Sequence, residues 1–335
     1  MVNEKNIGNV KHFSKEDLRF ATPAQVAKYR ARRLKCKVIV DLCSGIGIQS
    51  GAFAKTCKEV YSFEIDERKV EYAKKNFDIK NLKFEVGDIL EPSVVEKVRK
   101  ICPDVIFCDP ERLPEEKERN LNSIKPDLKK LLEVYSKITP NICLEVPPRI
   151  DLDKLKELGS FEAEYLSKDN KLNRLDLYFG NLKKDRISVV DVFSEIRIVD
   201  NKNRKSRIVK RPINYIYEVS EAIIRAGLIN ELATLVCAEV LEGTEKNKVL
   251  FTSKNPSLEF GCLARPYEII DLCKNNFELN TLLKRNRFGK VVIKYSIDPK
   301  DYWKERNQLE KGLIGEREAV VFMFNQDYLV CEEYD

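Results

Sequence analysis

Residues 38–47, which read VIVDLCSGIG, constrain the fold of this chain more than any other stretch. A run of strand-forming residues carries Asp41 near its end and leads directly into a glycine turn. Gly45 and Gly47 allow a left-handed backbone and let a ligand approach the main chain closely. The helix expected over 48–54 adds amide donors and the positive end of a dipole. The stretch therefore predicts a strand, turn and helix that bind a polar ligand; a turn without a ligand is the alternative.

The spacing of the glycines distinguishes between cofactors. A dinucleotide-binding turn reads G-x-G-x-x-G, but Gln49 and Ser50 stand where the third glycine belongs. An NAD-dependent dehydrogenase is therefore a distant alternative. The order that is present, Asp41-x-x-x-Gly45-x-Gly47, resembles motif I of the class I S-adenosylmethionine-dependent methyltransferases. In that family the glycine backbone lies against the methionine part of the cofactor.

Two further carboxylates follow strand-like segments. Residues 60–66 and 82–88 read as the second and third strands, and Glu64 and Asp88 lie at their ends. In an open parallel sheet this edge forms the ligand crevice, so Glu64 can bind both ribose hydroxyls and Asp88 can meet the adenine amino group. A single acid at a strand end is more often a helix cap or a solvated turn. Three acids in register favour a binding site.

A fourth strand over 104–109 leads into Pro110 and takes the place of the substrate-facing motif of the same family. Methyl transfer from a sulfonium needs an in-line nucleophile and little covalent chemistry. Asp109 and the backbone carbonyl fixed by Pro110 can supply this by holding an amino or ring nitrogen. Cys108 is a competing candidate, because a thiolate can attack a base carbon, but a cysteine inside a strand is more often a small buried hydrophobe.

The composition is that of a soluble enzyme with more than one domain. The 335 residues exceed what one core usually organises, and the 43% hydrophobic content is ordinary. Because no long apolar run and no charged leader occurs, we expect no membrane span, no secretory signal and a cytoplasmic protein. Ten cysteines without a C-x-x-C pair and a single histidine argue against a zinc site and a disulfide framework. We therefore expect no metal.

The first half alternates strand and helix patterns at the lengths of a doubly wound α/β sheet. Helices are expected over 23–35, 48–56, 67–76, 92–101, 125–139 and 151–158. Residues 142–146 form a fifth strand, and an antiparallel pair over 161–167 and 174–180 closes a seven-stranded Rossmann-like methyltransferase sheet. This predicts a methyltransferase domain over residues 1–183 with a short N-terminal extension.

The second half differs in pattern. Residues 184–214 alternate apolar and polar side chains around a basic stretch, which indicates a hairpin or an exposed connection. Residues 215–335 predict a smaller α+β domain. Its expected elements are a helix over 220–240, strands over 249–252, 291–294 and 319–324, and a helix that contains Trp303.

Positive charge gathers in three clusters, over 28–37, 202–211 and 284–290, although the net charge is only +6. Each cluster can neutralise phosphates, and a solvated lysine-rich surface is the alternative. Phe288 in the third cluster is either a stacking surface for a base or part of the core. The residues expected to contact substrate are Arg112, Arg204, Lys205, Arg207, Lys284, Arg285 and Arg287.

Further segments extend the resemblance over most of the chain. Residues 20–34, 223–232, 289–294, 298–299 and 315–319 resemble the class I methyltransferases that carry a C-terminal THUMP-like domain. Two positions depart from that family. The strand-four motif continues as Glu111-Arg112-Leu113 instead of Ala-Arg-Arg, and Pro147-Pro148 replaces a Pro-Gly turn.

The resemblance implies S-adenosylmethionine as the cofactor and, because true THUMP domains accompany tRNA-modifying enzymes, an RNA partner. It assigns the catalytic role to Asp109 and Pro110. The expected cofactor-binding residues are Asp41, Cys43, Gly45, Gly47, Glu64, Asp88 and Asp109. We therefore expect methyl transfer to a nitrogen of an RNA base, guanine or adenine in tRNA or rRNA. A methyltransferase acting on a protein or a small molecule, and an inactive RNA-binding protein with a retained cofactor fold, are the alternatives.

Overall fold

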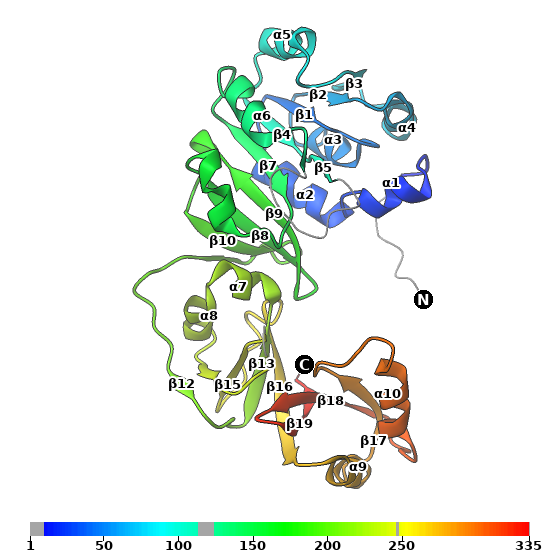
Figure 1. Ribbon diagram of the computed structural model, residues 1–335, viewed down its shortest axis with the longest axis vertical. Coiled ribbons are helices and arrows are strands. Elements are labelled where there is room, and N and C mark those ends of the chain that lie inside the picture. The colour runs from blue at the N-terminus through cyan, green and yellow to red at the C-terminus, as the bar shows by residue number, and fades with distance from the viewer. Residues whose placement is uncertain (1–9, 113–123, 246–247, 335) are drawn as a thin grey trace. The chain divides into compact units, whose positions relative to one another are not determined.

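The computed structural model describes residues 10–112, 124–245 and 248–334, without the side chains of residues 111 and 112. Arg112, a predicted substrate contact, therefore has its side chain outside the described residues. The chain forms two compact units (Figure 1). The first runs to residue 197 apart from residues 169–171, and the second holds 169–171 and the chain from 198 onward. Within the described residues, no helix is long and apolar enough to cross a bilayer.

A nine-stranded sheet forms the centre of the first unit, in the order β11-β10-β8-β9-β7-β4-β1-β2-β3. Its strands are β1 (Val38–Leu42), β2 (Glu59–Glu64), β3 (Leu82–Val86), β4 (Val105–Cys108), β7 (Ile142–Val146), β8 (Glu162–Lys168), β9 (Lys171–Tyr178), β10 (Ile187–Asp191) and β11 (Arg197–Val199). β5 (Glu111–Arg112) and β6 (Ile124–Lys125) form a separate ribbon. β1 to β4 and β7 run parallel, and β9 runs antiparallel to β7. The carboxyl ends of the parallel strands therefore meet at one edge.

The prediction of a seven-stranded sheet is wrong, because β10 and β11 extend it. Both strands lie in the stretch 184–214 that the sequence pattern assigns to a hairpin or an exposed connection. Every residue of β10 is buried, and the strand pairs in parallel with β8, which satisfies its backbone groups. Ser188 looks solvent-facing in the alternating pattern, but its Oγ donates to Glu162 Oε1 over 3.0 Å inside the unit. Burial on both faces of a strand near the sheet edge is a tertiary effect that the alternation hides.

Helices flank this sheet (Figure 1). They are α1 (Lys15–Phe20), α2 (Ala24–Arg33), α3 (Ile48–Phe53), α4 (Glu67–Asn76), α5 (Pro92–Ile101) and α6 (Leu128–Tyr135), with the short 3-10 helices η2 (Leu152–Leu158) and η3 (Gly180–Leu182). α4 and α5 confirm their predicted ranges at both ends, because their end signals are local. Asp66 caps α4 by accepting from the amides of Arg68 and Lys69, and Pro92 begins α5.

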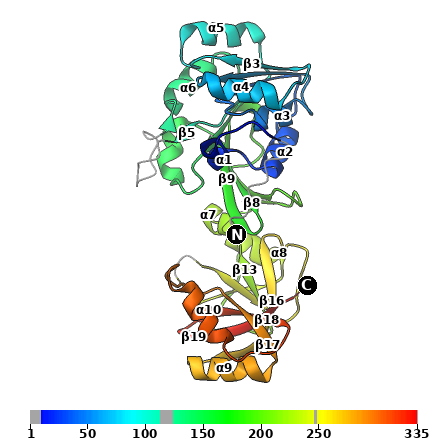
Figure 2. The ribbon, with the colours of Figure 1, turned by 90° about the vertical axis from the view of Figure 1, so that its right-hand side faces the viewer.

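The second unit holds an eight-stranded sheet in the order β12-β14-β15-β13-β16-β19-β18-β17. Its strands are β12 (Ile208–Val209), β13 (Tyr215–Val219), β14 (Glu239–Leu241), β15 (Leu250–Ser253), β16 (Ala264–Cys273), β17 (Phe288–Ile293), β18 (Arg317–Phe324) and β19 (Asp327–Glu333). Its helices are α7 (Glu221–Ala226), α8 (Ile229–Leu235), α9 (Asn276–Arg285) and α10 (Tyr302–Glu310). α9 and α10 pack beside β17 around a core that includes Leu283, Phe288 and Leu309 (Figure 2).

The single helix predicted over 220–240 is two helices, α7 and α8. Gly227 ends α7 with a left-handed φ of 71°, and an α-helix does not continue through that backbone. The apolar periodicity of the stretch is satisfied by two short helices as well as by one long one. Gly227 is the local stop signal that the prediction of one helix overlooks.

Candidate active site

The turn after β1 bends through three left-handed residues. Cys43, Gly45 and Gly47 have φ angles of 67°, 55° and 87°. At Gly47 a Cβ atom would lie 2.8 Å from the Phe84 ring, so this position needs glycine for its conformation and for its space. Gly47 therefore lies on the side of the turn that packs against Phe84, while Cys43 and Gly45 line the cavity described below.

Asp41 lies at the base of this turn and is 1% exposed. Ser50 donates a hydrogen bond to its Oδ2, while Oδ1 is buried without a hydrogen-bond partner. Burial raises the pKa of Asp41 to about 7; the Glu64 charge adds to the rise and the Ser50 hydroxyl opposes it. A buried acceptor without a donor at a cavity wall is expected where a ligand supplies the donor.

Glu64, at the end of β2, supports the turn as well as facing the cavity. Its Oε2 accepts from the Gly45 amide over 2.8 Å and its Oε1 from the Asp66 amide over 3.1 Å. A carboxylate oxygen can accept more than one hydrogen bond, so both oxygens of Glu64 can also accept from ribose hydroxyls. Asp88 lies at the same cavity but is exposed, and its Oδ1 accepts from the Leu90 amide over 2.9 Å. Its observed contact is thus a local turn.

Asp109 and Pro110 follow β4 at the same edge of the sheet and line the same cavity. Thr22 Oγ1 lies 3.5 Å from Asp109 Oδ2 and donates to it. Burial raises the pKa of Asp109 to about 8; Glu145 raises it further, while Arg30 and Arg174 oppose the rise. Asp109 therefore holds its proton far more tightly than an ordinary aspartate does.

A charged cluster that the sequence analysis missed lies beside Asp109. Arg30 of α2 is 0% exposed and donates to both oxygens of Asp176, over 2.8 and 2.6 Å, and to Glu145 Oε2 over 2.6 Å. Arg174 Nε pairs with Glu145 Oε1 over 2.8 Å. The sequence did contain a signal for this cluster, because Glu145 is an acid inside the otherwise apolar strand 142–146 and a buried charge requires a partner.

Seven of the predicted site residues line one cavity of about 1160 Å³ within the first unit. Its volume exceeds the roughly 300–1,000 Å³ of a typical small-ligand pocket, so it has room for a cofactor and part of a substrate. The predicted residues in its wall are Asp41, Cys43, Gly45, Glu64, Asp88, Asp109 and Pro110. The N-terminal segment adds wall residues that the site prediction omitted, which are Glu16, Asp17, Arg19, Phe20, Ala21 and Thr22. Among the described residues, no group of His, Cys, Asp or Glu is arranged to hold a metal ion.

Cys108 is unsuited to act as a nucleophile. It is 0% exposed on β4, and burial raises the pKa of its thiol well above the usual value. Its Sγ lies 3.8 Å from Cys43 Sγ. A thiolate is therefore disfavoured where carbon methylation would need one.

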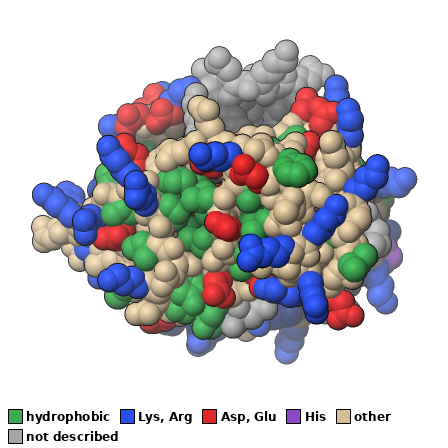
Figure 3. Space-filling model, turned by 90° about the horizontal axis from the view of Figure 1, so that it is seen from below, with side chains coloured by type: hydrophobic (Ala, Val, Ile, Leu, Met, Phe, Trp, Pro, Cys, Tyr) green, Lys and Arg blue, Asp and Glu red, His purple; other side chains and the backbone are tan. Residues whose placement is uncertain are grey.

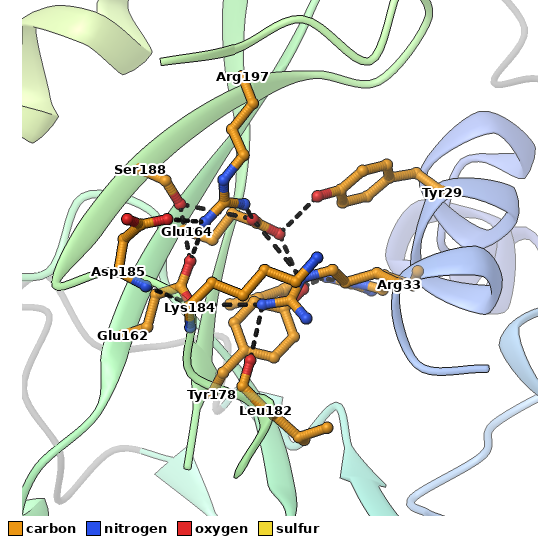
Figure 4. A network of polar contacts seen from close by, with 12 residues as sticks. Tyr29, Arg33, Glu162, Glu164, Tyr178, Leu182, Lys184, Asp185, Ser188 and Arg197 are labelled. Carbon is orange, nitrogen blue, oxygen red and sulfur yellow. Dashed lines mark hydrogen bonds and ion pairs between the residues drawn. The ribbon is translucent and has the colours of Figure 1, made fainter. Parts of the chain in front are cut away.

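The first basic cluster is partly internal. Arg30 lies in the charged cluster above, and Arg33 stacks over the Tyr178 ring with 4.3 Å to its centroid and donates to the Leu182 carbonyl over 2.8 Å. Figure 4 shows Arg33 and Arg197 converging on Glu162 and Glu164. Both the phosphate-binding and the solvated-surface interpretations are wrong for Arg30 and Arg33, because acids of the same chain already pair with them.

The other predicted substrate residues belong to the second unit. Lys205, Lys284, Arg285 and Arg287 are exposed, Arg207 pairs with Glu239 over 3.3 Å, and Arg204 donates to the Glu231 carbonyl over 3.3 Å. Phe288 is 0% exposed, so the stacking interpretation of this residue is wrong. One face of this unit intersperses Lys and Arg with Asp, Glu and hydrophobic side chains (Figure 3).

Three features of the first unit define its class: a parallel sheet with an antiparallel β9, an acidic glycine turn after β1, and Asp-Pro after β4. They are those of a class I S-adenosylmethionine-dependent methyltransferase. The orphaned Asp41 Oδ1, the Glu64 carboxylate and the open turn fit that cofactor. The family model described as RNA cap guanine-N2 methyltransferase matches residues 36–260, more than half of the chain. The chain belongs to that family, and S-adenosylmethionine is its cofactor.

Two curated relatives are uncharacterised S-adenosylmethionine-dependent methyltransferases from Mycobacterium tuberculosis, of strains CDC 1551 / Oshkosh and ATCC 25618 / H37Rv. Each is 26% identical over 226 residues, which cover 65% of this chain and 60% of the relative. The chain thus spans less than two thirds of their length. A crystal structure from Porphyromonas gingivalis W83, provisionally assigned as a methyltransferase, has a TM-score of 0.78 and 17% identity over 97% of this chain and 84% of that one. At 17% identity, the likeness to this crystal structure shows that the two chains share a fold.

Proposed function

We propose that this protein transfers a methyl group from S-adenosylmethionine to the exocyclic N2 amino group of guanine in RNA. One observation carries the proposal: Asp109 and Pro110 line the same cavity as the glycine turn. The description of the family, which names guanine N2 in RNA, supports the choice of atom.

The cofactor supplies an electrophilic methyl group on a sulfonium. Asp109 and the Pro110 carbonyl accept hydrogen bonds from the amino group and so hold its nitrogen in line. S-adenosylmethionine, which Asp41, Gly45 and Glu64 would hold, would supply the methyl group to this nitrogen and would keep the electron pair of the S–C bond on its sulfur. The nitrogen becomes positively charged, and its surplus proton passes to the Asp109 carboxylate. A pKa of about 8 suits an acceptor that works near neutral pH.

We further propose that the second unit, whose segments resemble a THUMP-like domain, contributes to RNA binding. The exposed Lys284, Arg285 and Arg287 near the end of α9 support this, because phosphate contacts come mainly from such side chains. The mixed charge of the face in Figure 3 favours local contacts over a broad basic surface.

The test is mass spectrometry of nucleosides from RNA of the native source, with and without the gene. We expect N2-methylguanosine to be lost without the gene, restored by the wild type and by Cys108→Ser, and not restored by Asp109→Ala. An unchanged set of methylated nucleosides in every RNA species would refute the proposal and favour a protein or small-molecule substrate. A covalent adduct trapped with a fluorinated pyrimidine would point to carbon methylation.

A further inference from the structure

Three neighbouring strands place charged side chains at one edge of the first sheet. Asp109 follows β4, Glu145 lies near the end of β7, and Arg174 lies near the middle of the antiparallel β9. Because β9 runs antiparallel to β7 and Leu175 pairs with Val146, Arg174 lies just beyond the carboxyl end of β7. All three residues line the cavity that holds the glycine turn.

These side chains form a row in the order Arg174, Glu145, Asp109, in which each contacts the next. Arg174 Nε pairs with Glu145 Oε1 over 2.8 Å, and Glu145 in turn interacts with the Asp109 carboxyl. Arg30 holds the other oxygen of Glu145 from the protein side, over 2.6 Å, and is itself held by Asp176. Arg30 and Asp176 are 0% exposed, so they fix the row without being available to a ligand.

The charges of this cluster do not balance. Three carboxyl groups, Asp109, Glu145 and Asp176, lie beside two guanidinium groups, so the cluster carries one excess negative charge when all three are ionised. Burial and the neighbouring Glu145 raise the pKa of Asp109 to about 8, so Asp109 gains a proton more readily than an ordinary aspartate does. A ligand that donates hydrogen bonds to Glu145 and Asp109 stabilises the ionised form of these carboxyl groups.

We propose that Arg174, Glu145 and Asp109 read the Watson–Crick edge of guanine. Along the cavity wall, Arg174 offers a hydrogen-bond donor, and Glu145 and Asp109 each offer an acceptor. Guanine presents the complement: the O6 acceptor, the N1 hydrogen and the N2 amino group. Adenine presents a donor at N6 and an acceptor at N1, which this row mismatches. The inference rests on the proposed function, since it assigns the residues that select the guanine named there.

The test compares bases that all carry the 2-amino group. Guanosine 5′-monophosphate and 2,6-diaminopurine riboside 5′-monophosphate differ at positions 1 and 6 only. Binding of each is measured by calorimetry or ligand-observed NMR with S-adenosylhomocysteine saturating the protein. We expect the guanine nucleotide to bind at least about tenfold more tightly, because the mismatched base leaves buried polar groups unpaired.

Variants then assign the preference to residues. Glu145→Gln and Arg174→Gln should each reduce the ratio of the two affinities toward one. Arg68→Gln is the matched control, because Arg68 lines the same cavity from α4 and pairs with Asp17 over 3.2 Å. It should leave the ratio unchanged. Equal weakening of both nucleotides in the Glu145 and Arg174 variants would show a merely structural role and overturn the inference.

The wild-type comparison needs no variant and decides the matter even if a variant fails to fold. Equal affinity for the two nucleotides, or no binding of either, overturns the inference. Failure of the proposed function has a different signature, because nucleoside analysis then shows no change in N2-methylguanosine whichever base the cavity prefers.

Discussion

The two sides of the cavity are built in different ways. On the cofactor side, Asp41 and Glu64 contact residues of a single turn and the helix after it, and Gly45 donates its amide directly to Glu64. On the substrate side, Asp109 depends on Glu145, Arg30 and Arg174, which come from distant parts of the chain. A local turn is specified by spacing, whereas a charged row inside a sheet must be neutralised by whatever the fold brings near. The difference predicts that the substrate side is the more sensitive to single changes.

The largest effect is expected from Arg30→Ala, which leaves Glu145 and Asp176 buried without their main partner. Loss of one member of a buried ion pair typically costs about 3–5 kcal/mol. We expect a drop of that order in the free energy of unfolding, measured by denaturant titration. Arg32→Ala is the control: Arg32 pairs with Glu195 at the surface, and its loss should change stability by less than about 1 kcal/mol. Equal effects would contradict the special position of Arg30.

Asp109→Asn keeps an acceptor oxygen but removes the group that takes the proton. Turnover should fall by about 10² to 10⁴-fold, the usual contribution of a proton acceptor, while calorimetric affinity for S-adenosylmethionine stays nearly unchanged. In the wild type, turnover should rise with pH up to about 8, because more Asp109 is ionised. Full turnover in the variant would remove Asp109 from the mechanism.

The free energy of unfolding should fall as pH rises, because Asp41 on the cofactor side and Asp109 on the substrate side both have raised pKa values. In the unfolded chain Asp41 and Asp109 lose their protons near the ordinary value of 3.8, but in the folded chain near 7 and 8. Between about pH 4 and 8 the folded state therefore binds more protons, and its stability falls as pH rises. Asp109→Asn and Asp41→Asn should each flatten the dependence of unfolding free energy on pH. An unchanged slope in both variants would contradict the raised pKa values.

On the cofactor side, Glu64→Ala should weaken S-adenosylmethionine binding by about 1–3 kcal/mol, because its charge-assisted hydrogen bonds disappear. Calorimetry measures this directly. Glu59→Ala is the control, because Glu59 is exposed at the other end of β2. Unchanged affinity in the Glu64 variant would exclude that residue from the site.

The smallest effect is expected in the second unit. Neutralising Lys284, Arg285 and Arg287 should make the salt dependence of RNA binding shallower, by about one unit of slope for each phosphate that a side chain no longer neutralises. Affinity for S-adenosylmethionine should not change. The same treatment of Lys74, Lys75 and Lys80, exposed in the first unit, serves as the comparison. Equal changes from both sets would indicate diffuse electrostatics.

Sequence spacing alone predicted the elements whose signals are local. α4 and α5 carry their own end signals, so their bounds were predicted correctly from neighbouring residues. The same holds for β7. The glycine turn and the acids at strand ends were placed at one cavity for a related reason, since parallel strands bring their carboxyl ends to one edge.

Only the tertiary structure decided the rest. The basic stretch 28–37 looked like a surface, yet packing of α2 buries Arg30 against acids more than a hundred residues away. The strands β10 and β11 complete the sheet because β8 offers an edge to pair with, which no alternation within 184–214 reveals. Backbone conformation and caps depend on adjacent residues and can be read along the chain, whereas the pairing of buried charges and strand edges depends on which distant segments the fold brings together.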